Sequence, residues 1–186
     1  MTKSVVVSGP PAIGKTTIAK GLAREFNLTH LSGGDILKEI ASEQGFSSTG
    51  DDWWDTEEGM KFLDQRKKNP EFDKKVDEKL KTLFQNGDVV ITSYTLPWMV
   101  DGGIKIWLAG DVENSAKRMQ HRDNLTEHDA LNVVKKRFSE NKIIYKDLYN
   151  FEFGKDLSVF DKIIETDGLN AQQVLDKAKS VVRELI

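Results

Sequence analysis

A glycine-rich stretch near the start of the chain carries the clearest chemistry in the sequence. It matches the pattern G-x-x-x-x-G-K-[ST], in which glycines let the backbone curl so that its N–H groups point at phosphate oxygens. The N-terminus of a following helix adds its dipole. Lys15 can reach the β- and γ-phosphates, and the Thr16 hydroxyl can bind Mg²⁺. The stretch predicts a nucleoside triphosphate site at Gly9, Pro10, Pro11, Ala12, Ile13, Gly14, Lys15, Thr16 and Thr17.

Two arginines later in the chain could complete such a site. Arg118 and Arg122 lie four residues apart in a helical pattern, so their guanidinium groups share one helix face and can converge on one phosphate cluster. Phosphoryl transfer requires such cations, because two anions must be brought into line. The alternative is that both arginines are solvated and pair with Glu113 or Asp123.

The sequence lacks the further motifs of other phosphate-loop proteins. It contains no N-K-x-D element, which is typical of guanine recognition. A Walker B carboxylate would follow a buried strand, yet Val89-Val90-Ile91 leads into Thr92-Ser93-Tyr94, and the nearest acids at other strand ends are Asp35 and Asp111. Small phosphoryl-transfer enzymes can hold Mg²⁺ with the loop hydroxyl, water and the nucleotide. The absence therefore favours a kinase over an ATPase or a switch.

Strand-like and helix-like segments alternate along the chain and must position these groups. Apolar or β-branched runs predict strands at 4–8, 28–31, 88–92, 104–108 and 162–165. Helical spacing and start signals predict helices at 15–27, 35–44, 56–68, 71–86, 112–122, 126–149 and 171–186. The alternation predicts an α/β fold, a three-layer sandwich in which helices cover both faces of a parallel sheet. Active groups then lie at the carboxyl ends of the strands.

Composition limits the class of protein. With 186 residues the chain is long enough for one α/β domain, and we expect residues 1–186 to form one. The 27 basic and 30 acidic side chains give a net charge of −3, which argues against a nucleic-acid binder. The chain has no cysteine, so disulfides and thiol nucleophiles are excluded, and its three histidines lack metal-ligand spacing. Because no apolar run is long enough for a signal or a membrane span, we expect a cytoplasmic protein that does not bind membranes. We also expect a monomer that binds no nucleic acid.

Several segments beyond the glycine-rich stretch carry a family resemblance. They are residues 31–38, 69–77, 98–100, 104–108, 116–118 with Arg122, 137–149 and 157–161. With residues 9–17 they resemble nucleoside monophosphate kinases, and the later segments resemble the archaeal type of cytidylate kinase. The resemblance implies a P-loop fold that transfers the γ-phosphoryl group of ATP to a nucleoside monophosphate, CMP or dCMP, with Mg²⁺ as cofactor.

The resemblance also implies where the acceptor binds. It places an acceptor-binding helical segment at residues 32–86, with Ser32, Asp35 and Lys38 at the acceptor phosphate. Asp35 would in addition orient water on Mg²⁺. From the residues alone, Asp35 could also serve as a helix N-cap.

A lid over about residues 118–128 is the second implied feature, and its arginines would close over the triphosphate. Arg137 matches an arginine on the helix after the lid, although it could also form a structural ion pair with Glu140 or Asp129. The implied catalytic set is Lys15, Arg118, Arg122 and Arg137.

The chain departs from the family at the acceptor site. Lys38 and Tyr94 stand where arginines are usual, Ser93 replaces a glycine, and Ile144 occupies a position that is commonly basic. Tyr94 is therefore a candidate acceptor contact of a different kind. These departures keep three alternatives open: another nucleotide acceptor (AMP, UMP or dTMP), a non-nucleotide small molecule, or a binding protein that switches with its nucleotide.

The tryptophans fall into two groups. Trp53 and Trp54 lie in a polar segment within the acceptor-binding part, where one of them could stack on a base or anchor the next helix to the core. Trp98 and Trp107 lie near or in predicted strands, and we expect both to be packing residues.

Overall fold

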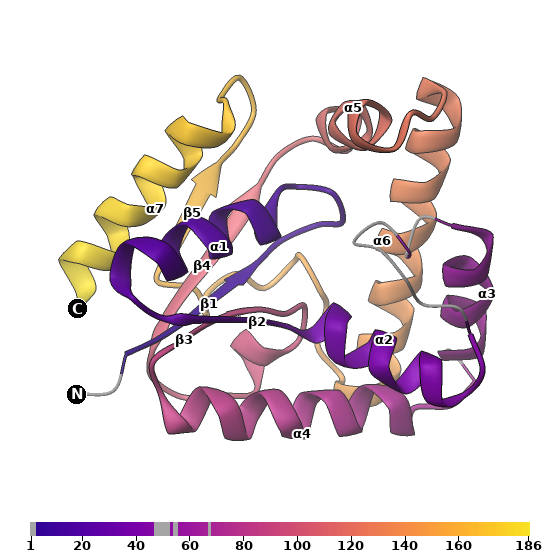
Figure 1. The fold of residues 1–186 in the computed structure, drawn as a ribbon, viewed down its shortest axis with the longest axis horizontal. Helices are drawn as coiled ribbons and strands as arrows, with labels where there is room; N and C mark the ends of the chain where they lie inside the picture. Colours follow the sequence, from indigo (N-terminus) through magenta and orange to yellow (C-terminus); the bar gives the residue numbers. More distant parts are fainter. Residues whose placement is uncertain (1–2, 47–52, 54–55, 67) are drawn as a thin grey trace.

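The predicted alternation of strands and helices is confirmed by a computed structural model, which describes residues 3–46, 53, 56–66 and 68–186 (Figure 1). The strands are β1 (Ser4–Ser8), β2 (Thr29–Ser32), β3 (Val89–Thr92), β4 (Ile104–Ala109) and β5 (Lys162–Glu165). The helices are α1 (Lys15–Phe26), α2 (Gly33–Glu43), α3 (Glu57–Arg66), α4 (Glu71–Asn86), α5 (Val112–Asp123), α6 (Glu127–Tyr149) and α7 (Ala171–Leu185), with a 3-10 turn η2 at Leu96–Trp98.

The five strands form one parallel sheet in the order β2-β3-β1-β4-β5. β1 lies at its centre, where Val7 is paired with Thr92 of β3 and with Ile106 of β4. All five residues of β1 are buried, as expected for a central parallel strand. Because the strands are parallel, the loops after β1, β2 and β3 emerge at the same edge of the sheet.

Helices cover both faces of the sheet and give the expected three layers. Val5 and Val7 of β1 pack with buried residues of α1 and α7, whereas Val6 packs with those of α2 and α4. Figure 1 shows α1 and α7 on one side of the strands and α4 on the other. The alternation of side chains along a strand produces this division.

The long helix α6 lies beyond the end of the sheet, beside α3 and α5 (Figure 1). Aromatic side chains fill the space beneath it: Trp98 stacks on Phe151 with ring centres 4.5 Å apart, and Trp107 is buried against Phe153. Both tryptophans are packing residues, as expected. Trp53 is also buried and packs on Phe62, which makes it an anchor for α3, and Trp54 lies outside the described residues.

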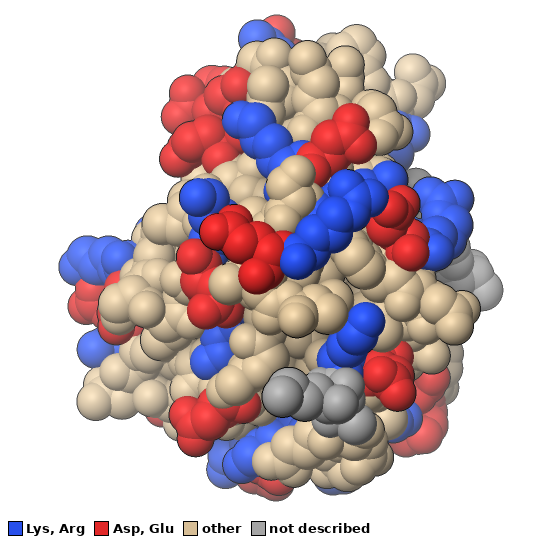
Figure 2. Space-filling model, turned by 90° about the vertical axis from the view of Figure 1, so that its left-hand side faces the viewer, with Lys and Arg blue, Asp and Glu red and all other residues tan. Residues whose placement is uncertain are grey.

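Charged side chains of both signs share the surface. On the face shown in Figure 2, basic and acidic side chains are interspersed, in keeping with the near balance of the composition. Ion pairs also connect helices: Glu25 of α1 pairs with Lys179 (2.9 Å) and with Arg183 of α7. None of the described helices is both long and apolar enough to cross a membrane.

Candidate active site

The loop between β1 and α1 has the backbone shape of an anion cradle. Gly9 adopts φ +145°, and a Cβ atom there would lie 2.5 Å from the carbonyl oxygen of Leu108, so only glycine fits. Gly14 (φ +103°) and Ala12 (φ +59°) also have positive φ, which costs an alanine about 1–2 kcal/mol. Strain of this kind persists where the fold imposes it, often at ligand sites. The loop enters α1 at Lys15, where the helix dipole favours an anion.

The side chain of Lys15 folds back beneath the loop. Its Nζ donates hydrogen bonds to the carbonyl oxygens of Gly9 (2.9 Å) and Pro10 (2.6 Å). The same atom lies 4.5 Å from the centre of the Tyr94 ring, a cation–π contact. Burial, and then the charge of Arg137, lower the pKa of Lys15 well below its ordinary value. An anion in the loop would offset both effects, so Lys15 is well placed to hold a phosphate.

A cavity of about 580 Å³ opens beside the loop and brings most of the predicted site residues together. Its wall includes Ala12, Ile13, Gly14, Lys15, Thr16, Thr17, Ser32, Asp35, Lys38, Tyr94, Arg118, Arg122 and Arg137. Gly9, Pro10 and Pro11 are not part of this wall, and the first two act through the carbonyl groups that hold Lys15. Residues from β2, α2, α5 and α6 and from the loop after β3 thus share one space with the glycine-rich loop.

Arg118 of α5 is held against the loop. Its Nη1 donates to Oγ1 of Thr166 (3.2 Å), its Nη2 donates to the Thr166 carbonyl oxygen (3.1 Å), and Nη1 lies 3.5 Å from the Ile13 carbonyl oxygen. Among the described residues its partners are therefore Thr166 and Ile13 rather than Glu113 or Asp123. Arg118 connects the loop to the end of β5.

Arg122 and Arg137 approach the cavity from different helices. Arg122, one turn after Arg118, forms a two-pronged ion pair with Asp123, with Nε–Oδ1 at 2.5 Å and Nη2–Oδ2 at 2.6 Å. This is one of the surface pairs left open by the sequence, although Arg122 also lines the cavity. Arg137 lines the cavity from α6, close enough to Lys15 to lower its pKa.

The start of α2 places the predicted acceptor residues. Ser32 is the N-cap, and its Oγ accepts a hydrogen bond from the backbone N–H of Gly34 (3.1 Å). The alternative that Asp35 is the N-cap is wrong, because Asp35 lies inside the first turn. Its carboxylate is 62% exposed and lies 3.8 Å from Nζ of Lys38.

The oxygen atoms of Thr16 and Asp35 suit Mg²⁺, which prefers hard oxygen ligands and retains several waters. Both side chains are exposed and line the cavity. Within the described ranges, no group of three or more histidine, aspartate or glutamate side chains could hold a metal ion. A magnesium ion here would therefore depend on water and phosphate oxygens for its remaining ligands.

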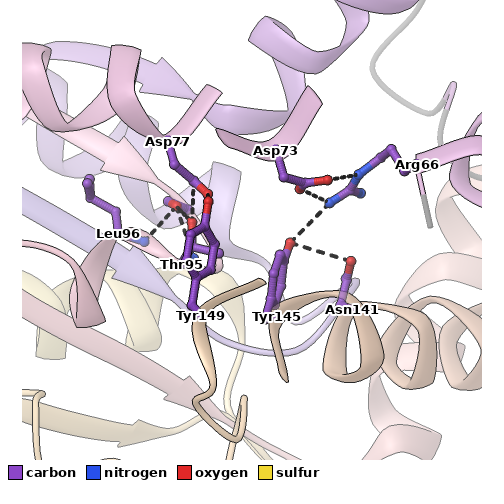
Figure 3. Close-up of polar contacts among 9 residues, drawn as sticks. Arg66, Asp73, Asp77, Thr95, Leu96, Asn141, Tyr145 and Tyr149 are labelled. Carbon is purple, nitrogen blue, oxygen red and sulfur yellow. Dashed lines mark hydrogen bonds and ion pairs between the residues drawn. The ribbon is translucent and has the colours of Figure 1, made fainter. Parts of the chain in front are cut away.

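Sequence reasoning missed a second set of polar residues in the cavity wall, which we call the inner polar cluster. Its members come from α3, α4 and α6, and all are buried: Arg66, Asp73, Asp77, Asn141 and Tyr145. Figure 3 shows Arg66 and Asp73 facing each other, with the Tyr145 hydroxyl below Arg66. Nε of Arg66 donates to Oδ2 of Asp73 (3.0 Å), and Nη2 donates to Oδ1 of Asp73 and to the Tyr145 hydroxyl (3.3 Å). Burial opposes the charge of Arg66, but Asp73 and Tyr145 raise its pKa.

Asp77, one helical turn after Asp73, connects three parts of the chain. Its carboxylate accepts hydrogen bonds from the hydroxyl groups of Thr95, in the loop after β3, and Tyr149, at the end of α6 (Figure 3). Burial raises the pKa of Asp77 to about 6, against the lowering effect of the two hydroxyl donors.

A pattern in the sequence could have revealed the cluster. Val76 and Leu80 mark the buried face of α4, and Asp73 and Asp77 lie on the same face at helical spacing. Burying a carboxylate on an apolar helix face costs free energy unless the charge is paired. The presence of two carboxylates there therefore indicates a partner within the fold.

The comparisons with known proteins agree with the geometry. The model of the AAA domain family matches residues 8–141. The cytidylate kinase of Methanocaldococcus jannaschii is 31% identical over 97% of this chain and 98% of that protein. The cytidylate kinase of Pyrobaculum islandicum is 32% identical over 92% of this chain and 88% of its own length.

Solved structures support the fold. The shikimate kinase of Acinetobacter baumannii, solved in complex with shikimate, has a TM-score of 0.59 at 16% identity and covers 99% of this chain and 94% of its own. At this identity the likeness concerns the fold alone. The family follows from the phosphate loop, the match to the AAA domain model and the relatives above 30% identity. The chain belongs to the P-loop nucleoside monophosphate kinases, within the AAA domain family.

Proposed function

We propose that this kinase transfers the γ-phosphoryl group of ATP to CMP or dCMP. The observation that carries the proposal is the gathering of cationic side chains around one cavity, among them Lys15, Lys38, Arg118, Arg122 and Arg137. Two phosphate groups that react with each other need this concentration of positive charge. The cytidylate kinases above support the choice of base.

The residues divide the work between donor and acceptor. Backbone N–H groups of the loop and the Lys15 ammonium group bind the donor phosphates, and Arg118, Arg122 and Arg137 neutralise the charge on the transferring group. Ser32, Asp35, Lys38 and Tyr94 belong to the acceptor side. Mg²⁺, held by Thr16 directly and by Asp35 through water, supplies further charge neutralisation when it is bound. Closure of the segment at about 118–128 excludes water from the reacting phosphoryl group.

An ADP-release assay across monophosphates tests this assignment. The purified chain is supplied with ATP and Mg²⁺ and with CMP, dCMP, UMP, AMP, dTMP or GMP in turn. We expect the highest kcat/KM with CMP or dCMP. If another monophosphate gives the highest value, the base assignment is wrong and the reaction class stands; if none stimulates ADP release, the proposal fails altogether.

One observation favours a second candidate, a small-molecule acceptor without a nucleobase. Tyr94 places an aromatic ring over Lys15 at a position where the resembling family has an arginine, so the acceptor side has one cation fewer. A panel of hydroxylated metabolites in the same assay separates the two candidates. This second function requires that one metabolite exceed every nucleotide in kcat/KM.

A further inference from the structure

The loop after β3 carries Tyr94, and the side chain of Ser93 holds this loop in shape. The Ser93 Oγ atom accepts hydrogen bonds from the backbone N–H groups of Thr95 (3.2 Å) and Leu96 (3.1 Å). The backbone N–H of Ser93 donates to the carbonyl oxygen of Val7 in β1 (3.4 Å). A glycine at position 93 could not accept the first two bonds. The residues on both sides of Tyr94 are therefore fixed, one of them to the central strand.

A further hydrogen bond ties the same loop to α4. The hydroxyl group of Thr95 donates to Oδ1 of Asp77, and the Tyr149 hydroxyl, at the end of α6, donates to Oδ2 (2.5 Å; Figure 3). Asp77 is only 3% exposed. Hydrogen bonds to an ionised carboxylate are shorter and stronger than those between neutral groups. Asp77 thus holds the loop after β3 and the end of α6 at defined positions relative to α4.

The position of Asp77 costs free energy. In the described part of the chain, its carboxylate accepts hydrogen bonds from hydroxyl groups and from no cation. A buried carboxylate without a hydrogen-bonded cation is more costly than an apolar side chain of similar size. Hydrogen bonds are directional, whereas apolar contacts are not. The carboxylate therefore gives its donors, Thr95 and Tyr149, a defined geometry rather than net stability.

Tyr94, between the two fixed residues, contacts the lysine of the phosphate loop. The centre of its ring lies 4.5 Å from Nζ of Lys15, and a cation–π contact requires a separation within about 6 Å. The ring also packs edge-on against the buried Phe153, with centres 5.3 Å apart and planes at 84°. The fixed backbone and this neighbour together set the position of the ring. A shift of the loop after β3 would therefore change the distance between Tyr94 and Lys15.

We propose that Asp77 is a positioning residue, which through its hydrogen bond with Thr95 keeps the Tyr94 ring against Lys15. Asp77 and Thr95 both line the cavity, and their action on the transfer reaction goes through Tyr94. The effect on catalysis rests on the proposed function. The placement of the ring does not, because it can be measured in the protein without substrate.

The first test is an NMR measurement on the chain without substrate. Protons held over the face of an aromatic ring resonate upfield, so the ε-methylene signal of Lys15, assigned by its absence in Lys15→Ala, should lie upfield of the other lysines. Thr95→Val removes the hydroxyl group and should move this signal toward its position in Tyr94→Leu. Thr95→Ser keeps the hydroxyl group and should leave the signal near that of the unaltered chain. An unmoved signal in folded Thr95→Val overturns the inference.

The second test is a double-mutant cycle on kcat/KM for CMP. We expect Thr95→Val to lower this value about two- to fourfold, no more than Tyr94→Leu does. In a chain that already carries Tyr94→Leu, Thr95→Val should have almost no further effect, because residues that act through one contact are not additive. Equal losses in the two backgrounds overturn the inference. If no monophosphate is phosphorylated, the proposed function fails, and the NMR measurement still decides the placement of Tyr94.

A matched control comes from another buried hydroxyl group that bonds to α4. Ser4 Oγ donates to the carbonyl oxygen of Phe84 (2.6 Å), at the end of β1 away from the phosphate loop. Ser4→Ala should lower stability but leave the Lys15 signal and kcat/KM unchanged. If Thr95→Val does not fold, Thr95→Val with Asp77→Asn removes the buried charge as well and carries the same two expectations. A control that moves the Lys15 signal as much as Thr95→Val does overturns the inference.

Discussion

The glycine-rich loop and the inner polar cluster line the same cavity but are built in different ways. The loop is one continuous segment, and it holds Lys15 through its own carbonyl oxygens. The cluster joins side chains from α3, α4 and α6, and its hydrogen bonds connect residues up to 79 positions apart in the chain. A local segment can be recognised from residue spacing, whereas an assembled cluster depends on the fold being complete. The two regions should therefore respond differently to substitution.

Replacement of Lys15 should give the largest effect of all, a loss of catalytic activity. Lys15→Ala removes the charge at the donor phosphates, and we expect kcat to fall about 1,000-fold or more. The free energy of unfolding should change little, because the contacts of Lys15 with two carbonyl oxygens and the Tyr94 ring are offset by the cost of burying its charge. Lys117→Ala on the exposed side of α5 is the matched control. Near-normal kcat in Lys15→Ala would contradict the assignment.

In the inner polar cluster, removal of one partner of the Arg66–Asp73 ion pair should mainly lower the stability of the fold. Asp73→Ala leaves the charge of Arg66 buried without its carboxylate, and we expect the free energy of unfolding to drop by about 3–5 kcal/mol. Urea unfolding measures the change. Glu71→Ala, which breaks the exposed pair with Lys74 on the same helix, should cost less than about 1 kcal/mol. Equal losses in the two variants would remove the distinction between the buried pair and the surface pair.

The raised pKa of Asp77 predicts a pH dependence of stability. A pKa of about 6 in the fold, against 3.8 ordinarily, means that the unfolded chain loses this proton first, so stability falls as pH rises from about 4 to 6. At about 1.4 kcal/mol per pKa unit the fall is about 3 kcal/mol. Asp77→Asn should remove this contribution.

The comparison with Asp77→Asn isolates one group among the many carboxyls that titrate in this range. The difference in unfolding free energy, variant minus unaltered chain, should grow toward pH 7 and level off above it. A difference that stays constant between pH 4 and 7 would mean that Asp77 ionises in the fold as it does in water.

Tyr94 lies between the two regions and should give the smallest effect. Its ring contacts Lys15 on one side and packs near Tyr145 on the other. Tyr94→Leu removes a cation–π contact of about 0.5–1 kcal/mol, so we expect a two- to fivefold loss in kcat/KM for the acceptor. Tyr94→Phe keeps the ring and should retain this part of the activity. Identical losses in both variants would assign the effect to the hydroxyl group instead.

The strands and helices could be predicted from the sequence because each depends on nearby residues. The run Ser4–Ser8 and the spacing of apolar residues in α4 gave the correct element types, with bounds within two residues. The loop was found for the same reason. By contrast, the pairing of Arg66 with Asp73, and of Asp77 with Tyr149, depends on how α3, α4 and α6 pack, which no local pattern specifies.

The fold also decided between alternatives that spacing left open. Ser32 rather than Asp35 caps α2 because the helix begins two residues earlier than predicted. Arg118 and Arg122 lie one turn apart on α5, yet the first contacts Thr166 and the second pairs with its neighbour Asp123. Equal spacing on one helix face did not give them the same partners, because Arg118 bonds to the residue that follows β5 and Arg122 pairs with its own neighbour in the chain.

The carboxylate of Asp77 receives hydroxyl hydrogens from two distant parts of the chain, Thr95 and Tyr149. This arrangement has a consequence for how the sequence can evolve. Replacing Asp77 by an apolar residue removes the carboxylate acceptor of both hydroxyl groups, and replacing either hydroxyl residue leaves the carboxylate with one donor fewer. Substitutions at the three positions should therefore be accepted together more often than singly, and related kinases should show them changing as a set.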